Sequence, residues 1–369
     1  MRRDALVNLL LGVSIALLPL YTRVTALDFN RTGKDNLLVF LFGAFCFLLP
    51  SAKRRMTGMM YISFAYILLA VVLNQWHVMS INVMFQSFYI LSGVTFFCHY
   101  YEKHGSGKSL DYITNGMIVG ALIQSAIAIP SYFGFNPYNE FILLLSGGSL
   151  LDTVPSQTGR TIGSLGNNNL LGSYLAITLP AFYGLKHKWL GLIPFLALCL
   201  TGSLMGICAA IAGLCYFFIS DFKIYIYSVT SLVMATFHLY APKGSDNGRF
   251  EIWRDMFSKV DLRHILFGAG PGWFPDQKFM IKNTYVVQEH SGFLSIFNVV
   301  GLLGIFLVMP TFIKFVMSKD QNKIFASVLF AAFCSSYGHF VFHQSTVVII
   351  ILIAASICVA EGNNNVISL

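Results

Sequence analysis

The segment ALVNLLLGVSIALLPLY, residues 5–21, decides the fold class because it carries no charged side chain. An apolar run of about 17 to 25 residues can cross a hydrocarbon core about 30 Å thick. Backbone polar groups in lipid must be bonded within their own segment, so the run is predicted to be a helix. It follows Arg2 and Arg3, as the core of a signal peptide would, but no small-residue cleavage site comes after it. We therefore interpret it as a first membrane span.

Similar apolar runs recur along the whole chain. Its 369 residues are 56% hydrophobic and only 11% charged, and the mean hydropathy is +0.68. Soluble domains are about 25% charged. The sequence predicts an all-α polytopic membrane bundle, one integral membrane domain over residues 1–369. About twelve transmembrane helices are expected, near residues 5–22, 36–50, 57–73, 83–99, 112–130, 169–185, 189–202, 204–220, 224–240, 291–313, 323–340 and 344–360.

Basic residues in the short loops set the orientation. On one side of the membrane fall Lys53, Arg54, Arg55, Lys103, Lys108, Lys186, Lys188, Lys223, Lys314, Lys319 and Lys323. By the positive-inside rule this side is cytoplasmic, and an even number of spans places both termini there. The predicted orientation depends most on the turn at residues 201–203. A single long helix in its place would put every later segment on the opposite side of the membrane.

Two long segments lie on the outer side, residues 131–168 and 241–289, and we expect them to form the site. The seven cysteines all fall in apolar runs, which argues against a disulfide framework or a thiolate metal site. His339 and His343 have the spacing of a helical metal pair, but no third ligand is evident. Neither a metal nor another cofactor is predicted. The net charge of +8 is spread over loops, so membrane topology explains it better than nucleic-acid binding.

Residues 248–260 predict an amphipathic helix on or against the membrane surface. Phe250, Ile252, Trp253, Met256, Phe257 and Val260 share its apolar face. Arg249 falls in the middle of that face at the helix N-terminus, where a cation is unfavourable unless an anion sits beside it. Arg249 is therefore a candidate phosphate ligand, although the side chain could instead snorkel to water. The nearby FGAGPGW, residues 267–273, is interpreted as a structural turn.

Arg160 is the one basic residue of the first outer segment. Glycines around it permit close backbone approach to a ligand, and Asn167 to Asn169 offer caps for the next helix. Two arginines from separate loops can together bind a diphosphate through paired hydrogen bonds. A single arginine in a loop, however, often binds no ligand.

His290 stands where the second outer segment enters a span, so its imidazole can titrate near neutral pH and still reach an aqueous substrate. His290 is therefore the candidate general base. The alternative is that its imidazole only forms a hydrogen bond with a backbone carbonyl group. Glu289 is the candidate to orient that imidazole, unless it is merely solvated.

Three stretches together resemble the O-antigen ligase and polymerase superfamily. They are GRTIGSLGNNNLLGSYL (159–175), GRFEIWRDMFSKVDLRHILFGAGPGWF (248–274) and EHSGFLSIFNVVGLLGIF (289–306). The resemblance implies a multi-pass enzyme of the bacterial cytoplasmic (inner) membrane whose site faces the periplasm or exterior. It would move a glycan from a polyprenyl (undecaprenyl) diphosphate to a sugar hydroxyl of a glycan or glycolipid acceptor. Arg160 and Arg249 would bind the diphosphate, and His290 would activate the hydroxyl.

This chain departs from the family pattern at two places. Ser291 follows the histidine where the family often has Asn, and Leu204 follows Ser203 where the family often has Arg. The missing arginine lowers the charge of the anion site, and Arg254 is a candidate for a supporting role although it falls on the polar helix face. The lack of a large soluble domain argues against a protein-glycosylating enzyme of the superfamily. Ligase and repeat-unit polymerase differ only in the acceptor, and we favour the ligase slightly. A transporter or flippase is the rival class, and it predicts charges or broken helices near the bilayer midplane.

Overall fold

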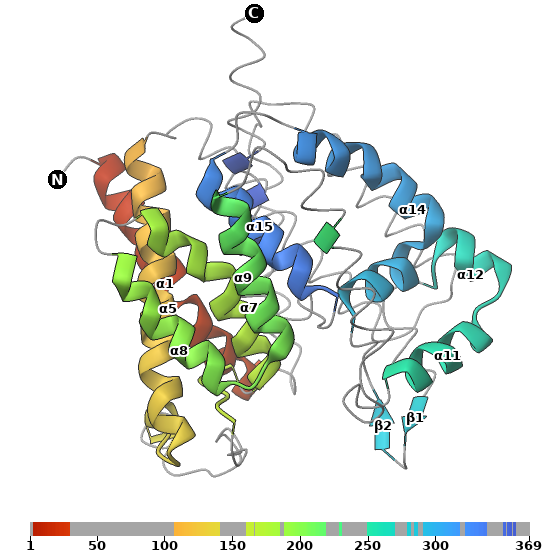
Figure 1. The fold of residues 1–369 in the computed structure, drawn as a ribbon, viewed down its shortest axis with the longest axis horizontal. Helices are drawn as coiled ribbons and strands as arrows, with labels where there is room; N and C mark the ends of the chain where they lie inside the picture. The colour runs from red at the N-terminus through yellow and green to blue at the C-terminus, as the bar shows by residue number, and fades with distance from the viewer. Residues whose placement is uncertain are drawn as a thin grey trace, which may run out of the picture.

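The computed structural model describes residues 3–29, 107–140, 160–165, 167–184, 188–218, 229–230, 249–269, 279–281, 284–286, 291–317, 322–337, 350–351, 353–355 and 357–358 (Figure 1). Helices dominate these residues. The α-helices are α1 (Arg3–Phe29), α5 (Gly107–Tyr132), α7 (Asn168–Thr178), α8 (Leu192–Leu200), α9 (Leu204–Phe218), α11 (Arg249–Lys259), α12 (Leu262–Phe267), α14 (Gly292–Met317) and α15 (Lys323–Ser335). The 3-10 turns η2 (Leu179–Gly184) and η3 (Lys188–Gly191) extend α7 and precede α8.

One helix among the described residues is long and apolar enough to cross a membrane, Ser109–Tyr132 within α5. Shorter apolar helices are Asn8–Leu20, Lys188–Leu200, Leu204–Phe218 and Lys323–Ser335. The predicted spans at 36–50, 57–73 and 83–99 lie outside the described residues. The described residues are therefore mainly helical, as predicted, and include a candidate membrane span.

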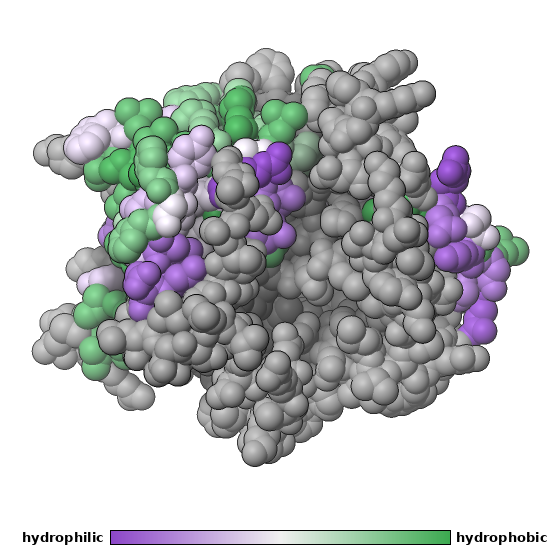
Figure 2. Space-filling model, turned by 90° about the horizontal axis from the view of Figure 1, so that it is seen from below, coloured by the Kyte–Doolittle hydropathy of each residue, from purple (hydrophilic) through white to green (hydrophobic). Residues whose placement is uncertain are grey.

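Large apolar side chains lie exposed along several of these helices. On α1 they recur with helical spacing at Leu6, Leu9, Leu10, Val13 and Leu17. Figure 2 shows hydrophobic side chains gathered on the side where α1, α5 and α8 lie, and hydrophilic ones at the edge where α11 lies. Soluble monomers rarely expose long apolar faces, so these faces need a non-aqueous neighbour.

Small residues let α1 and α5 pack with their backbones in contact. Gly12 and Ala16 of α1 face Gly116 and Gly120 of α5, each pair four residues apart. A Cβ on Gly12 would stand 2.8 Å from the carbonyl oxygen of Tyr112, and one on Gly116 would collide with the carbonyl oxygen of Gly12. This small-xxx-small pattern is typical of helix pairs in membranes.

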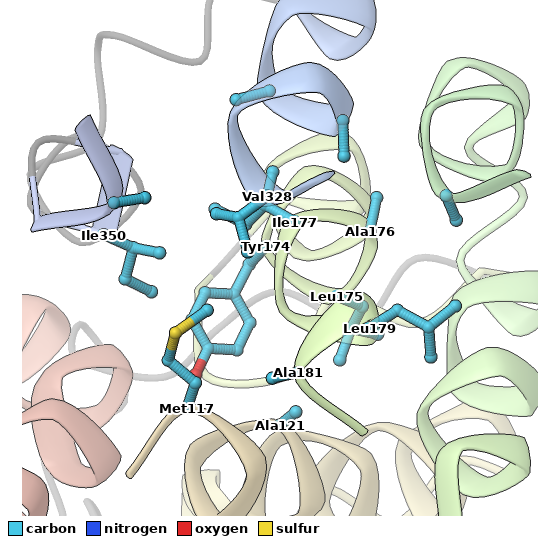
Figure 3. Close-up of a cluster of buried hydrophobic side chains, with 14 of the residues drawn as sticks. Met117, Ala121, Tyr174, Leu175, Ala176, Ile177, Leu179, Ala181, Val328 and Ile350 are labelled. Atoms are coloured by element: carbon cyan, nitrogen blue, oxygen red, sulfur yellow. The ribbon is translucent and has the colours of Figure 1, made fainter. Parts of the chain in front are cut away.

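Small residues also bring α7, α9 and α15 into close contact. A Cβ on Gly206 of α9 would meet the backbone of Gly172 of α7 at 3.0 Å, and one on Gly213 would meet Cβ of Ala331 of α15 at 2.9 Å. Tyr174 of α7 is fully buried, and its ring points toward Met117 and Ala121 of α5 (Figure 3). The described core therefore lies where α5, α7, α9 and α15 converge.

The chain turns between α8 and α9 at Thr201 and Gly202. Gly202 has φ of +63°, which a continuing α-helix cannot contain and which glycine adopts without strain. Ser203 then caps α9, because its Oγ accepts from the backbone N–H of Gly206 at 3.2 Å. The two short runs are thus separate helices, as predicted, and the alternative of one long helix is excluded.

Helix α14 is broken at Gly301, a feature that the sequence reading of one continuous span did not predict. Gly301 has φ 62° and ψ −173°, and its Cα faces the backbone of Leu266 and Gly268 at the C-terminal end of α12. The backbone N–H of Ala269 donates to the carbonyl oxygen of Asn298 at 2.6 Å. The glycine turn after Phe267 is therefore structural, as interpreted, at least for its described part.

A short hairpin accompanies the helices and leaves the predicted all-α class of the described residues unchanged. Strands β1 (Phe279–Ile281) and β2 (Thr284–Val286) pair antiparallel, with Met280 opposite Tyr285. They lie within the second outer segment. Their β-branched and aromatic residues favour strands, but six residues are too few for a periodic signal to reveal them.

Candidate functional site

Residues 160–165 re-enter the helical bundle rather than run over its surface. From Thr161 to Leu165 they are buried. The Thr161 backbone N–H donates to the carbonyl of Leu200 at 3.2 Å, and its Oγ1 donates to the carbonyl of Ala128 at 2.7 Å. Ala128 precedes the end of α5 by four residues, so the segment packs about one helical turn below that end.

Gln124 of α5 holds the deeper part of this segment. Its Nε2 donates to Oγ of Ser164 at 2.7 Å, and its Oε1 accepts from the backbone N–H of Ser164 at 3.3 Å. Ser164 Oγ in turn donates to the carbonyl of Pro19 in α1 at 3.2 Å. Gly163, the residue before Ser164, has φ of +55°, and a Cβ there would stand 2.9 Å from Gln124 Oε1. Irregular backbone at this depth is thus bonded to both flanking helices.

Arg160, at the mouth of the segment, is exposed and lies over the α8–α9 turn. A Cβ built on Gly202 would stand 3.3 Å from its Nε and 3.5 Å from its Cγ. The Asn168 Nδ2 of α7 donates to the carbonyl of Thr201 at 3.2 Å, which brings the start of α7 to the same turn. Arg160 is therefore held beside the beginnings of both α7 and α9.

The N-termini of α7 and α9 make this end of the bundle electropositive. Asn167 caps α7, because its Oδ1 accepts from the backbone N–H groups of Asn169 at 2.8 Å and Leu170 at 3.3 Å, as the asparagine run predicted. Each helix N-terminus carries roughly half a positive charge. Two such termini beside the Arg160 guanidinium form an arrangement that favours an anion. The contribution of α9 was not predicted from the sequence, in which its signal is Gly202 followed by Ser203.

The start of α14 meets the same end of the bundle through α15. Ser173 of α7 and Ser335 of α15 share a buried hydrogen bond of 2.7 Å between their hydroxyls. The next residue, Ser336, accepts at its carbonyl from the backbone N–H of Gly292 at 2.8 Å. The ring of Phe293 packs on Tyr337 with centroids 4.6 Å apart. The residues just after His290 are thus tied to the helices that surround Arg160.

Ser291 occupies the N-cap position of α14. It is buried, its carbonyl accepts from the backbone N–H of Ser295 at 3.0 Å, and its Oγ lies 3.5 Å from the backbone nitrogen of Leu294. Serine and asparagine are both strong N-cap residues. Ser291 therefore supplies the same capping chemistry that an asparagine at this position would supply.

Helix α11 packs on α14 through its apolar face. Ile252 and Met256 are buried and form a cluster with Ala269, against which Leu294 of α14 packs. Phe257 faces Phe297 of α14 with ring centroids 6.2 Å apart. The polar positions, including Arg254, are largely exposed, which confirms the predicted amphipathic character. The helix begins at Arg249, as predicted.

The structure places the predicted site residues only in part. Arg160 is described in full, whereas Arg249 is described as the first residue of α11 without its side chain. His290 and Glu289 lie outside the described residues, as do His339 and His343. Arg254 points away from the apolar face of α11, so no described contact links it to Arg160. Within the described ranges, no three His, Cys, Asp or Glu side chains cluster closely enough to hold a metal ion.

Comparisons of the chain with protein-family models, curated proteins and solved structures found no match.

Proposed function

We propose that this protein is a metal-independent integral membrane glycosyltransferase that transfers a glycan from a polyprenyl diphosphate to a sugar hydroxyl, as O-antigen ligases do. One observation carries the proposal. Arg160, the N-termini of α7 and α9, and the start of α14 directly after His290 belong to one connected end of the bundle. An anion site and a candidate base would then face the same substrate.

Three described features support a membrane location. Helix α5 is long and apolar enough to span a bilayer, and the α1–α5, α7–α9 and α9–α15 contacts run over glycine and alanine. Exposed leucines on α1 and α8 suit a lipid environment. We extend this to a bundle of about twelve spans with both termini in the cytoplasm and the Arg160 end outside.

The depth of the Arg160 segment supports a lipid-linked substrate. Thr161 and Ser164 pack about one and two helical turns below the end of α5, at Ala128 and Gln124. Such irregular backbone is tolerated in a membrane only where protein surrounds it. Arg160 would therefore stand near the depth of a lipid headgroup, where the diphosphate of a polyprenyl carrier would lie.

In the proposed reaction the acceptor hydroxyl oxygen attacks the anomeric carbon while the bond from that carbon to the diphosphate oxygen breaks. The hydroxyl proton passes to the imidazole of His290, a contribution of about 10² to 10⁴-fold. The diphosphate leaves with the bonding electron pair, and Arg160 and Arg249 stabilise its growing charge. Glu289 would orient the imidazole. A single displacement inverts the anomeric configuration, so a product that retained it would exclude this mechanism.

The N-terminus of α9 lies where the family often has an arginine, directly after the serine at the start of a middle span. Here Leu204 takes that place and is exposed, while Ser203 caps the helix. The helix dipole and Arg160 supply positive charge at this turn, so an anion site persists without the second arginine. A repeat-unit polymerase of the same superfamily uses the same donor chemistry, and the acceptor separates the two.

One described feature also fits the rival transporter class, namely the break of α14 at Gly301. Transporters place such breaks around an ion or substrate site. In this chain the backbone of Leu266 and Gly268 packs against the break, and Asn298 accepts from Ala269. The break is thus filled by the chain itself, which favours the enzyme.

The test is glycan transfer by the purified protein from an undecaprenyl-diphosphate oligosaccharide, with a core glycolipid or a second lipid-linked chain as acceptor. His290→Ala should abolish transfer, and Arg160→Ala and Arg249→Ala should raise the donor KM. Arg263→Ala, which removes an exposed cation of the same outer segment, is the matched control and should retain activity.

Two results would count against the proposal. Full activity in the histidine and arginine variants would show that the site is misplaced. A folded wild-type protein that transfers with neither acceptor would favour transport.

A further inference from the structure

We propose that Gln124 and Ser164 form a positioning pair that holds Arg160 over the α8–α9 turn. The inference rests on the proposed function, because it assigns the pair to donor binding. Gln124 lies in the C-terminal half of α5 among apolar side chains and is fully buried, as is Ser164. Polar side chains at such depth are costly unless they are bonded. Both ends of this amide are bonded to the same residue of the re-entrant segment.

The geometry leaves little freedom between the pair and Arg160. Thr161 is bonded on one side to Leu200 and on the other to Ala128. Gly163 adopts a left-handed conformation and lies in contact with Leu171 and with Gln124 Oε1. The three residues between Arg160 and Ser164 are thus fixed at both ends. Loss of the Gln124 amide would leave the backbone N–H of Ser164 without an acceptor and release this segment.

The pair positions Arg160 through the backbone of residues 160–164. Loss of the pair should therefore weaken binding of the donor's diphosphate and should not alter the proton transfer to His290. Gln124→Met keeps the length of the side chain without its hydrogen bonds, and Ser164→Ala removes only the hydroxyl. We expect each to raise the donor KM about tenfold and to lower kcat as well, because Arg160 binds the diphosphate in the ground state and stabilises its growing charge in the transition state. The double variant should be no worse than the poorer single variant, because the two residues act as one unit.

Ser125→Ala is the matched control. Ser125 neighbours Gln124 on α5 and is equally buried, but its Oγ donates to the carbonyl of Ala121 within the same helix. Its loss should lower stability to a similar small extent without changing the donor KM. Binding of undecaprenyl diphosphate, measured by thermophoresis in detergent, should weaken in Gln124→Met and Ser164→Ala but not in Ser125→Ala.

The outcomes separate this inference from the proposed function. If Arg160→Ala weakens binding of undecaprenyl diphosphate while Gln124→Met and Ser164→Ala bind normally, the positioning role is wrong and the anion site stands. If Arg160→Ala itself binds normally, the anion site fails and the inference fails with it. If Gln124→Met does not fold, Ser164→Ala alone decides. A KM shift as large in Ser125→Ala would mean that the effect is general loosening of α5.

Discussion

A side chain added at Gly120 would clash with Tyr174, and this allows a direct test of the packing where α1, α5 and α7 meet. A Cβ on Gly120 would stand 2.5 Å from the hydroxyl oxygen of Tyr174 and 3.1 Å from the carbonyl oxygen of Ala16. Tyr174 is fully buried, and its hydroxyl finds no hydrogen-bond partner among the residues that the structure describes. The ring cannot move aside without displacing its neighbours in the core.

Overpacking of a dense core costs about 1 to 3 kcal/mol, and we expect Gly120→Ala to fall in that range. Tyr174→Phe removes an unsatisfied buried oxygen, so it should be neutral or stabilise by about 1 kcal/mol. The double variant should regain most of the loss, because only the contact with Ala16 remains. The coupling energy between the two sites should therefore be about 1 to 2 kcal/mol and favourable.

The assay is unfolding of the purified protein by sodium dodecyl sulfate in mixed micelles, followed by circular dichroism. Gly184→Ala is the control, since a Cβ there meets only the mobile end of Ile324 at 2.7 Å and should cost little. Additive losses in Gly120→Ala and Tyr174→Phe, with no recovery in the double variant, would refute the described packing of α7 on α5.

Two further predictions concern the outer segment and α14. Gly301→Ala should cost at least about 1 to 3 kcal/mol, because an L-residue is strained at φ 62°, ψ −173° and its Cβ would strike the backbone at Gly268; limited proteolysis should then cut near α12 much faster. The backbone N–H of His264 holds the pKa of the Asp261 carboxyl below its ordinary value, so the ionised cap stabilises α12 above the unfolded pKa and loses this effect as pH falls through the folded one. The difference in unfolding midpoint between wild type and Asp261→Ala should accordingly shrink from about pH 6 to about pH 3, and a constant difference would contradict this origin.

Local signals in the sequence predicted the helices and several of their ends. The glycine at 202 marked the α8–α9 turn, the asparagine at 167 marked the start of α7, and the apolar face of residues 248–260 predicted α11. In each case the deciding contacts lie within a few residues of one another. Hydrophobic spacing and capping chemistry express such contacts directly.

Other features depend on contacts between distant residues and could not be read from the chain. Gln124 looks like a stray polar residue until Ser164 is placed against it, and Gly301 looks like an ordinary helical glycine until Leu266 packs on its Cα. The link from α7, which begins beside the α8–α9 turn, to the start of α14 runs through the Ser173–Ser335 bond, between residues 162 positions apart. Only three-dimensional packing joins these pairs.

The bond from Ser164 to the carbonyl of Pro19 joins residues 145 positions apart. During synthesis at about 5 to 20 residues per second, α1 would be made roughly 7 to 30 s before the segment that it binds. Once residue 132 has been made, the glycine contacts between α1 and α5 can hold the first helix in place until residues 160–165 follow. Assembly of the Arg160 end therefore depends on a helix pair that is complete before the ribosome reaches the arginine.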